Sequence, residues 1–582
     1  MPNYQCRLFD FDILNIETQD ELSDSDDEKK YKGDKREFVV KMYGIDTTGK
    51  TYCIFVNGFI PFFYVRIPNK WNKRHIYKFK DFLVDKIGNY YKESITECRI
   101  VEKKKLYGFD AGKKYKFMIV KFKNMNVYNK AKNVWYTDES FKKRKLHRNP
   151  KTNEFGIQFP KTNDYLQLYE AQIPPLLRFF HIQEISPSGW IEIDKRFVSS
   201  NSNKTNCDYE FTIDWLRTGK KFNIKSLPEK EDPVPYKICS FDIEASSSHG
   251  DFPVPKKTYK KMIGEIIEYW RKNKSTIRSK TPEEKEQLFI ELILSAFGYN
   301  KKDISNVFPK KKPLKINLIN AIQKTLEHPL KALLDRSKDE WKKLKKIEEE
   351  EEPDVYYTAL KKWHPKPQPY YNLCKDYNLI KLLDSDMAGD SKLLIMDRAM
   401  ERDKGYPEIQ PNGMIRIVYR KKIPGYLPEL EGDKCTFIGS TFIKYGQMNP
   451  YYNHCVVLNT CDNTDEVENS QIVPCKTERD VLLEWTKMIK YENPDIIIGY
   501  NIFGFDWDFM IKRSEELNCK DEFLKLGREK YDRCKVIHKT VKVASGEHNL
   551  TYVKIPGRLQ VDLYNHFRKE VNLSSYKLDF VA

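Results

Sequence analysis

Two acidic residues separated by a single position mark the first place where this sequence could do chemistry. Asp242 and Glu244 lie in an apolar stretch, residues 238–245, that is typical of a β-strand. Side chains two positions apart share one face of a strand, so these carboxylates should converge while Phe241 and Ile243 point into the opposite layer. Like charges this close repel unless a cation joins them, which favours Mg²⁺ or Mn²⁺. A lone D-x-E pair in a strand is common, however, and does not establish a metal site.

The second candidate group is the string Y-N-I-F-G-F-D at residues 500–506. It follows an apolar run typical of a buried strand and precedes a predicted helix over 507–517. Ligands commonly bind at the carboxyl end of a strand in an open α/β sheet. Asp506 could instead cap the helix, Asn501 could cap a turn, and Phe505 could be a core ring. Capping alone, however, does not require an amide and an aromatic ring beside the carboxylate.

The overall charge of the chain suits a polyanionic partner. The 582 residues include 102 Lys and Arg against 84 Asp and Glu, a formal net charge of +18. Such a balance is compatible with nucleic acid, although many basic proteins bind none.

Cysteine usage and hydropathy indicate the cellular compartment of the protein. The 12 cysteines form no C-x-x-C motif and no Cys/His cluster, which argues against a zinc site or a disulfide framework and favours a reducing, intracellular compartment. The first residues do not resemble a secretion signal, and no apolar run is long enough to cross a bilayer. We therefore expect no membrane partner.

The amino-terminal part of the chain, residues 1–235, has a sequence pattern that predicts a β-rich α+β region. Short β-type runs alternate with charged turns, and the proline-rich stretch 227–235 resembles a linker. The acidic stretch 23–28 should be a solvated loop. The basic clusters 103–105 and 142–145 are either exposed charged faces or contacts to a DNA backbone.

The rest of the chain, residues 236–582, predicts an α/β domain interrupted by a helical, charged insertion at about 257–432. Within the insertion, T-P-E-E at residues 281–284 is a capping box with Pro at the first helical position. Beyond it, a β-like run at 435–443 and a helix capped at Thr477 restore the α/β pattern.

Together the two acidic strings resemble the first and second exonuclease motifs of family B DNA polymerases, which read D-x-E and N-x-x-x-F-D. The resemblance covers the chain outside the insertion, is closest to the delta-type enzymes, and with so large an insertion is most similar to polymerases of large DNA viruses. Other segments that carry it are 57–64, 186–191, 240–245, 499–501, 557–563 and 573–578.

This resemblance implies a ribonuclease H-like 3′→5′ proofreading exonuclease behind an amino-terminal DNA-binding region. It assigns Asp242, Glu244 and Asp506 as catalytic ligands of two Mg²⁺ or Mn²⁺ ions that hydrolyse the 3′-terminal phosphodiester. Tyr500, Asn501 and Phe505 would hold the single-stranded 3′ end.

The family's third exonuclease motif, Y-x-x-x-D, and its polymerase carboxylates do not occur in the sequence, and we expect them beyond Ala582. Asp562 should instead end its strand or cap the next helix.

The resemblance thus implies the front part of a replicative polymerase whose partners are primer-template DNA and the carboxy-terminal polymerase portion, with a sliding clamp as a further candidate. A viral enzyme would work in the host cytoplasm, within a viral factory, or in the nucleus. The alternatives are a catalytically inactive DNA-holding module of a split polymerase and a stand-alone exonuclease acting on RNA.

Overall fold

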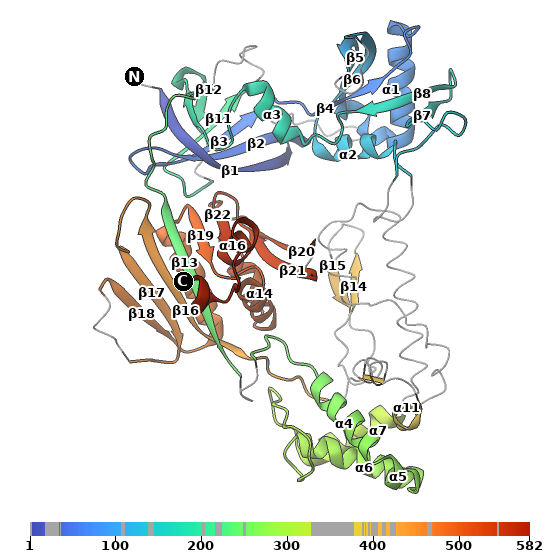
Figure 1. The fold of residues 1–582 in the computed structure, drawn as a ribbon, viewed down its shortest axis with the longest axis vertical. Helices are drawn as coiled ribbons and strands as arrows, with labels where there is room; N and C mark the ends of the chain where they lie inside the picture. The colour runs from blue at the N-terminus through green and yellow to red at the C-terminus, as the bar shows by residue number, and fades with distance from the viewer. Residues whose placement is uncertain are drawn as a thin grey trace, which may run out of the picture.

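The structure is a computed structural model in which β-rich parts occupy the top and middle and a helical part lies at the bottom (Figure 1). The predicted acidic loop at 23–28 and most of the basic cluster at 142–145 lie outside the described residues. The described residues are 3–17, 34, 36–105, 111–137, 145–200, 204–215, 224–247, 252–327, 378–386, 389, 392–393, 396, 406–409, 415–418, 427–462, 468–543 and 546–582.

The amino-terminal part contains two sheets, which agrees with the predicted β-rich α+β texture. A seven-stranded sheet has the order β10-β11-β3-β2-β1-β9-β12, and a five-stranded sheet has the order β5-β6-β4-β8-β7. The strands of the first sheet are β1 (Tyr4–Glu17), β2 (Arg36–Ile45), β3 (Thr51–Asn57), β9 (Trp190–Ile193), β10 (Val198–Ser200), β11 (Tyr209–Asp214) and β12 (Ile224–Ser226). Those of the second are β4 (Phe62–Arg66), β5 (Ile95–Lys104), β6 (Lys114–Phe122), β7 (Ile157–Phe159) and β8 (Asp164–Tyr169).

Helices cover these sheets and close their cores. Two helices share a buried apolar cluster with the five-stranded sheet, and α3 packs on the core of the seven-stranded sheet. Lys103 and Lys104, at the end of β5, are exposed. The helical elements of this part are α1 (Lys73–Ile87), α2 (Met125–Asn133), α3 (Pro175–Gln183), η1 (Asn89–Ser94) and η2 (Lys195–Phe197).

A six-stranded mixed sheet with the order β18-β17-β16-β13-β19-β22 forms the middle of the molecule. The central strand β13 pairs antiparallel with β16 and parallel with β19, and β19 pairs parallel with β22. This is the α/β arrangement that the sequence predicted after residue 236. Its strands are β13 (Lys237–Ser246), β16 (Lys434–Lys444), β17 (Tyr452–Leu458), β18 (Ser470–Cys475), β19 (Ile496–Gly499) and β22 (Leu559–Asp562).

Three helices of this domain share one buried cluster with the sheet: α13 (Glu478–Glu492), α14 (Asp506–Glu516) and α15 (Lys520–Phe523). The side chain of Thr477 accepts a hydrogen bond from the backbone N–H of Asp480, as its capping role predicts. Helix α13 is capped at its carboxyl end by Asn493, which adopts a left-handed conformation (φ 53°). Asparagine tolerates that conformation, and the following Pro494 cannot continue the helix.

The described residues of the insertion between β13 and β16 are mainly helical and have a hydrophobic core of their own, built from residues between Tyr259 and Leu430. The predicted capping box at Thr281 is confirmed, with both of its hydrogen bonds present. The sequence did not predict the hairpin of β14 (Tyr406–Ile409) and β15 (Ile415–Val418), whose strands are too short to show a periodic pattern. The helices are α4 (Lys260–Lys272), α5 (Lys274–Arg278), α6 (Pro282–Ala296), α7 (Lys315–Glu327) and α11 (Leu379–Asp384).

Residues 554–557, at the end of β21 (Gly546–Lys554) and before β22, contact the amino-terminal part of the chain. The backbone N–H of Gly557 donates to Asp10 over 2.7 Å, and Lys554 forms an ion pair with Asp12. Among the described helices, none has the length and hydropathy to span a membrane. The remaining elements are β20 (Lys535–Val543), α16 (Leu563–Glu570) and α17 (Leu578–Val581).

Candidate functional site

Strand β13 presents its two carboxylates as the alternation of its residues predicted. Asp242 and Glu244 are exposed, whereas Phe241 and Ile243 are only 3% and 4% exposed and belong to the core of the sheet domain. The ring of Phe241 lies 5.3 Å from that of Trp507, the residue that follows Asp506. This packing brings the start of α14 against the middle of β13.

Asp506 is the first residue of α14 and is almost completely buried, at 2% exposure. The backbone N–H of Ile243 and the carboxyl of Asp242 lie beside its carboxyl and shift its pKa in opposite directions. Burial, followed by the negative charge of Asp242, raises the pKa of Asp506 to about 7. The N-cap position belongs to Phe505, so Asp506 is not the helix cap of the alternative interpretation.

The pair Asp242 and Asp506 has the character of a cation site. Oδ1 of Asp506 is buried and has no hydrogen-bond partner in the described part of the chain. Two carboxyl groups in contact, one of them with an unmatched oxygen, fit a divalent ion with oxygen ligands. Glu244 is not gathered with them, because no group of three or more acidic, His or Cys side chains among the described residues is close enough to hold a metal. The structure therefore brings together two of the three predicted ligands.

The end of β19 approaches β13 closely because residue 499 is glycine. A Cβ atom there would lie 2.8 Å from the carbonyl oxygen of Phe241, so any side chain would push the two strands apart. The loop that follows turns at Asn501, which has a left-handed backbone (φ 58°). This geometry carries the chain from the sheet edge to the start of α14.

Asp562 fixes that loop from the neighbouring strand. Its carboxylate accepts hydrogen bonds of 3.0 Å from the backbone N–H groups of Asn501 and Phe503. The same carboxylate caps α16 through the backbone N–H of Tyr564, at 3.0 Å. The prediction that Asp562 caps the next helix is confirmed, and its hold on the Asn501 loop is an additional structural role that the sequence did not indicate.

The predicted DNA-holding side chains lie in different settings. The Asn501 amide lies over Gly504, where a Cβ atom would approach its Cγ to 3.0 Å. The hydroxyl of Tyr500 donates to the carbonyl of Tyr576 over 2.5 Å. Phe505 is half-buried and contacts the rings of Phe509 and Phe252, at 5.5 and 5.2 Å. Phe505 is therefore partly packed into the protein interior, as the alternative interpretation of a core ring expected.

Tyr500, Asn501 and Gly504 line one side of an open groove with a volume of about 490 Å³. The hairpin strand β21 and the segment after β22 form its other walls and contribute polar side chains that include His548, Asn549 and Lys577. Sequence patterns did not identify these residues, because only the folded chain brings β21 and the segment after β22 beside residues 500–504. A groove with aromatic, amide and basic side chains suits a single strand of nucleic acid.

Comparison with known proteins relates this chain to DNA polymerases. The family model described as DNA polymerase family B, exonuclease domain, matches residues 166–313 and 418–581. A DNA polymerase of Phaeocystis pouchetii virus is 34% identical over 99% of this chain and 54% of its own length. A DNA polymerase of Pyramimonas orientalis virus is 30% identical over 94% of this chain and 40% of its own. The chain therefore spans about half the length, or less, of these relatives.

More distant similarities are shorter or weaker. The DNA polymerase delta catalytic subunit of Dictyostelium discoideum is 32% identical over 27% of this chain and 14% of its own length. Among solved structures, the family B DNA polymerase of the archaeon Pyrobaculum calidifontis aligns with 99% of this chain and 39% of that one. Its TM-score of 0.42 and identity of 11% are too low to support an argument.

Proposed function

This chain belongs to DNA polymerase family B, and on that premise we propose that residues 236–582 trim the 3′ end of a DNA strand as a metal-dependent exonuclease. The exonuclease domain of the family is ribonuclease H-like, and this chain has the corresponding mixed sheet with helices. The observation that carries the proposal is the contact between the carboxyl groups of Asp242, on strand β13, and Asp506, on helix α14. Oδ1 of Asp506 is buried there and has no hydrogen-bond partner among the described residues.

We assign Asp242, Glu244 and Asp506 as the ligands of two divalent ions, Mg²⁺ or Mn²⁺. When bound, such ions lower the pKa of an attacking water and stabilise the charge on the leaving 3′-oxygen. Asp242 supplies an exposed carboxylate to this site, and Asp506 supplies a buried one at the start of α14. Glu244 lies on the same strand face and would join them by a side-chain movement.

The strand to be trimmed would lie in the groove beside Asn501. Asp562 holds the backbone of this loop, so the Asn501 amide is positioned before the nucleic acid binds. Tyr500 and the neighbouring aromatic side chains offer flat surfaces to bases of any sequence, which a proofreading enzyme requires. Phe505, which directly precedes Asp506, would contact the strand only at the edge of this groove, because it is not among the residues that line it.

We further propose that residues 1–235 bind DNA and that the longer relatives indicate a polymerase portion as the partner of this chain in viral DNA replication. A sliding clamp is a further candidate partner. The site of action would be a viral factory in the host cytoplasm, or the nucleus. In this domain arrangement, with a DNA-binding region at 1–235 and an exonuclease domain at 236–582, the helical insertion at about 257–432 is an addition to the exonuclease domain.

The direct test is an exonuclease assay of the full chain with Mg²⁺ and a 5′-labelled single-stranded oligonucleotide. We expect shortening from the 3′ end that is lost in the Asp242→Ala/Glu244→Ala variant and in Asp506→Asn. Asp508→Asn is the matched control, because Asp508 lies two residues further along α14 and pairs with Lys512 instead. Trimming that survives in the double variant would contradict the assignment.

A second candidate function is a catalytically inactive module that holds DNA. It is favoured by the position of Glu244, which is not gathered with the other two carboxylates. This function predicts salt-dependent binding to primer-template DNA without any shortening of the 3′ end. Trimming by the purified chain would exclude it.

A further inference from the structure

Two buried arginines lie together where the sheet domain meets the amino-terminal part of the chain. Arg528 is completely buried, and Arg558 is 2% exposed. Both guanidinium groups donate to Oδ1 of Asn493, Arg528 over 3.3 Å and Arg558 over 2.9 Å, so their positive charges are close together. Like charges held together away from water repel each other unless anions accompany them.

One carboxylate accompanies the two arginines. Asp495 forms an ion pair with Arg528 at 2.5 Å. Arg558 donates only to uncharged oxygens, which include the carbonyls of Leu526, at 2.9 Å, and Pro494, and it has no ion-pair partner among the described residues. Nη1 of Arg528 and Nη2 of Arg558 are buried, and neither has a hydrogen-bond partner in the described part of the chain. The arginine pair therefore carries one positive charge in excess.

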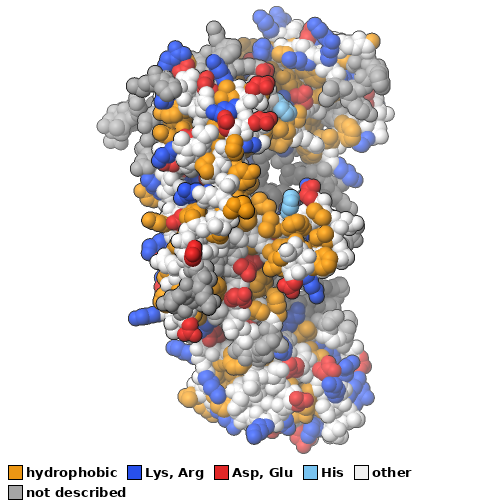
Figure 2. Space-filling model, turned by 60° about the vertical axis from the view of Figure 1, so that its left-hand side comes forward, with side chains coloured by type: hydrophobic (Ala, Val, Ile, Leu, Met, Phe, Trp, Pro, Cys, Tyr) orange, Lys and Arg blue, Asp and Glu red, His pale blue; other side chains and the backbone are white. Residues whose placement is uncertain are grey.

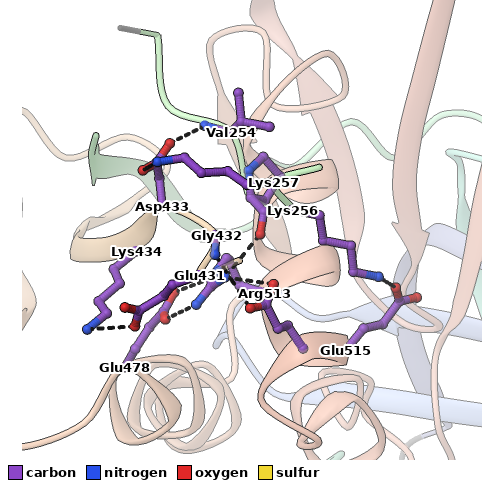
Figure 3. A network of polar contacts seen from close by, with 12 residues as sticks. Val254, Lys256, Lys257, Glu431, Gly432, Asp433, Lys434, Glu478, Arg513 and Glu515 are labelled. Atoms are coloured by element: carbon purple, nitrogen blue, oxygen red, sulfur yellow. Dashed lines mark hydrogen bonds and ion pairs between the residues drawn. The ribbon is translucent and has the colours of Figure 1, made fainter. Parts of the chain in front are cut away.

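A fully paired arginine of the same domain shows what Arg558 lacks. Arg513 is 1% exposed, and it donates to both oxygens of Glu478, at 2.7 and 2.5 Å (Figure 3). Its remaining terminal nitrogen donates to the carbonyl of Pro255 over 3.0 Å and lies 3.0 Å from Glu516. Arg558 is similarly buried without a carboxylate of its own. An anion for Arg558 must therefore come from a different kind of side chain.

A short segment of the amino-terminal part, residues 204–207, reaches the arginine pair. The backbone N–H of Asn206 donates to the carbonyl of Arg528 over 2.8 Å, and the amide of Asn493 donates to the carbonyl of Asn206 over 3.1 Å. The upper and middle parts of the molecule touch in the space-filling view, with an opening beside the contact (Figure 2). Cys207, the next residue, is partly exposed and therefore lies near solvent.

Cys207 lies beside a second thiol, that of Cys53. Cys53, on β3, is fully buried, and Cys207 packs against the small hydrophobic cluster that contains it. The neighbouring Cys53 and then the two arginines lower the pKa of Cys207 to about 7, against the effect of burial. Burial raises the pKa of Cys53 well above its usual range. Near neutral pH the pair therefore consists of a thiolate at Cys207 and a thiol at Cys53.

The other ionisable groups around the two thiols are already matched or uncharged. Lys41, on β2, forms an ion pair with Glu529. Glu210, on β11, accepts a hydrogen bond of 2.7 Å from the backbone N–H of Thr205. Burial raises the pKa of Tyr43 well above its usual range, so this side chain is neutral. The arginine pair is therefore the source of positive charge that remains to be balanced by the thiolate.

We propose that Cys207 is a peroxide-reactive thiolate that forms a disulfide with Cys53. Its sulfur attacks hydrogen peroxide, so an S–O bond forms, the O–O bond breaks, and the leaving hydroxide takes up a proton to become water. The sulfur of Cys53 then attacks that of Cys207, so the S–S bond forms, the S–O bond breaks, and hydroxide leaves as water with the thiol proton of Cys53. Two thiols lose two electrons in total, and one peroxide is reduced to two molecules of water.

The charges of the site direct the first step to Cys207 rather than to Cys53. The guanidinium groups stabilise the thiolate, which is the reactive form of a cysteine, whereas the buried thiol of Cys53 stays protonated until it attacks. In a reducing compartment such a disulfide is transient, which is typical of redox-sensing cysteines. The reaction uses none of the carboxyl groups assigned above as metal ligands, so its test is independent of the exonuclease assay.

The first test follows the alkylation of Cys207 by iodoacetamide as a function of pH, measured by mass spectrometry of the full chain. We expect a half-maximal rate near pH 7 in the folded chain. In the chain unfolded in urea the same thiol should titrate near about 8.5, the usual value of a free cysteine. Identical profiles in the folded and unfolded chains would overturn the proposal.

The second test treats the reduced full chain with hydrogen peroxide at pH 7 and maps its disulfides. We expect a bond between Cys53 and Cys207 that dithiothreitol reverses. Cys53→Ser should abolish this bond and leave a sulfenic acid at Cys207 that dimedone traps. Cys98→Ser is the matched control, the same substitution at another cysteine of the amino-terminal part, and should retain the bond.

The unchanged chain alone decides the outcome, because the disulfide is mapped there without any substitution. Oxidation of the exposed Cys461 while Cys207 stays unmodified would contradict the proposal, and so would a disulfide from Cys207 to a cysteine other than Cys53.

Discussion

The two ends of helix α14 carry buried charges of opposite kind. At its start, Asp506 contacts a second acidic side chain, Asp242, and retains an oxygen without a hydrogen-bond partner. Near its end, Arg513 is paired through two nitrogens with Glu478, and a further nitrogen lies 3.0 Å from Glu516. One end is therefore electrostatically incomplete within the described chain, and the other is complete.

This difference separates a binding site from a structural contact. A buried ion pair whose hydrogen bonds are all formed needs no ligand. Removal of one partner therefore lowers the free energy of unfolding. A buried carboxyl group beside another raises the free energy of the ionised protein until a cation arrives. Substitutions at the two ends should therefore affect activity and stability in opposite ways.

The largest expected effect is on activity at Asp506. Asp506→Asn should lower the rate of 3′-end trimming by about a thousandfold or more, because a neutral amide cannot replace a charged ligand. Single-turnover assays on a 5′-labelled strand would measure it. A rate within tenfold of the unchanged chain would place the ligands elsewhere.

The next effect is on stability at Arg513. Arg513→Met should reduce the free energy of unfolding by about 3–5 kcal/mol, because Glu478 would remain buried without its partner. Urea denaturation would measure it, with Lys512→Met as the control. Lys512 is the adjacent residue, but its pair with Asp508 is partly exposed, so a change of only about 0–1 kcal/mol is expected there. Equal effects of both substitutions would show that the buried pair has no special role.

The pH dependence of the metal-free protein should reveal the Asp506 pair. A carboxyl whose pKa is raised in the folded state stabilises the fold below about pH 4 and loses that contribution as the pH rises through about 7. The shift corresponds to at most about 4 kcal/mol, and we expect roughly half because water reaches Asp242. In EDTA, Asp506→Asn should therefore be more stable than the unchanged chain at pH 8 and not at pH 4. Thermal unfolding at both values tests this, and a variant that is less stable at pH 8 would contradict it.

The smallest predicted effect concerns the loop between sheet and helix. Gly504→Ala should displace the Asn501 amide and raise the KM for a single-stranded 3′ end by about three- to tenfold, with little change in stability. Gly264→Ala is the control, since a Cβ there meets no atom within 4 Å. If both substitutions leave KM unchanged, the Asn501 amide does not hold the strand.

Local patterns in the sequence predicted the elements, whereas the contacts between distant residues required the structure. The alternation in β13 and the caps at Thr477 and Thr281 follow from neighbouring residues alone. The meeting of Asp242 with Asp506 could be expected only from strand ends and the family resemblance. No local signal joins Arg513 to Glu478, which lie on different helices, or reveals that Glu244 stands apart from the other two carboxylates.

The most direct test of the carboxyl pair is a crystal of the full chain soaked in Mn²⁺ at pH 8, with data collected for anomalous scattering. We expect a peak at coordination distance, roughly 2.0–2.6 Å, from the carboxylate oxygens of both Asp242 and Asp506. The same crystals of Asp506→Asn should lose it. Well-ordered density for both side chains, still in contact and with no anomalous peak between them, would show that Asp242 and Asp506 do not bind a divalent ion.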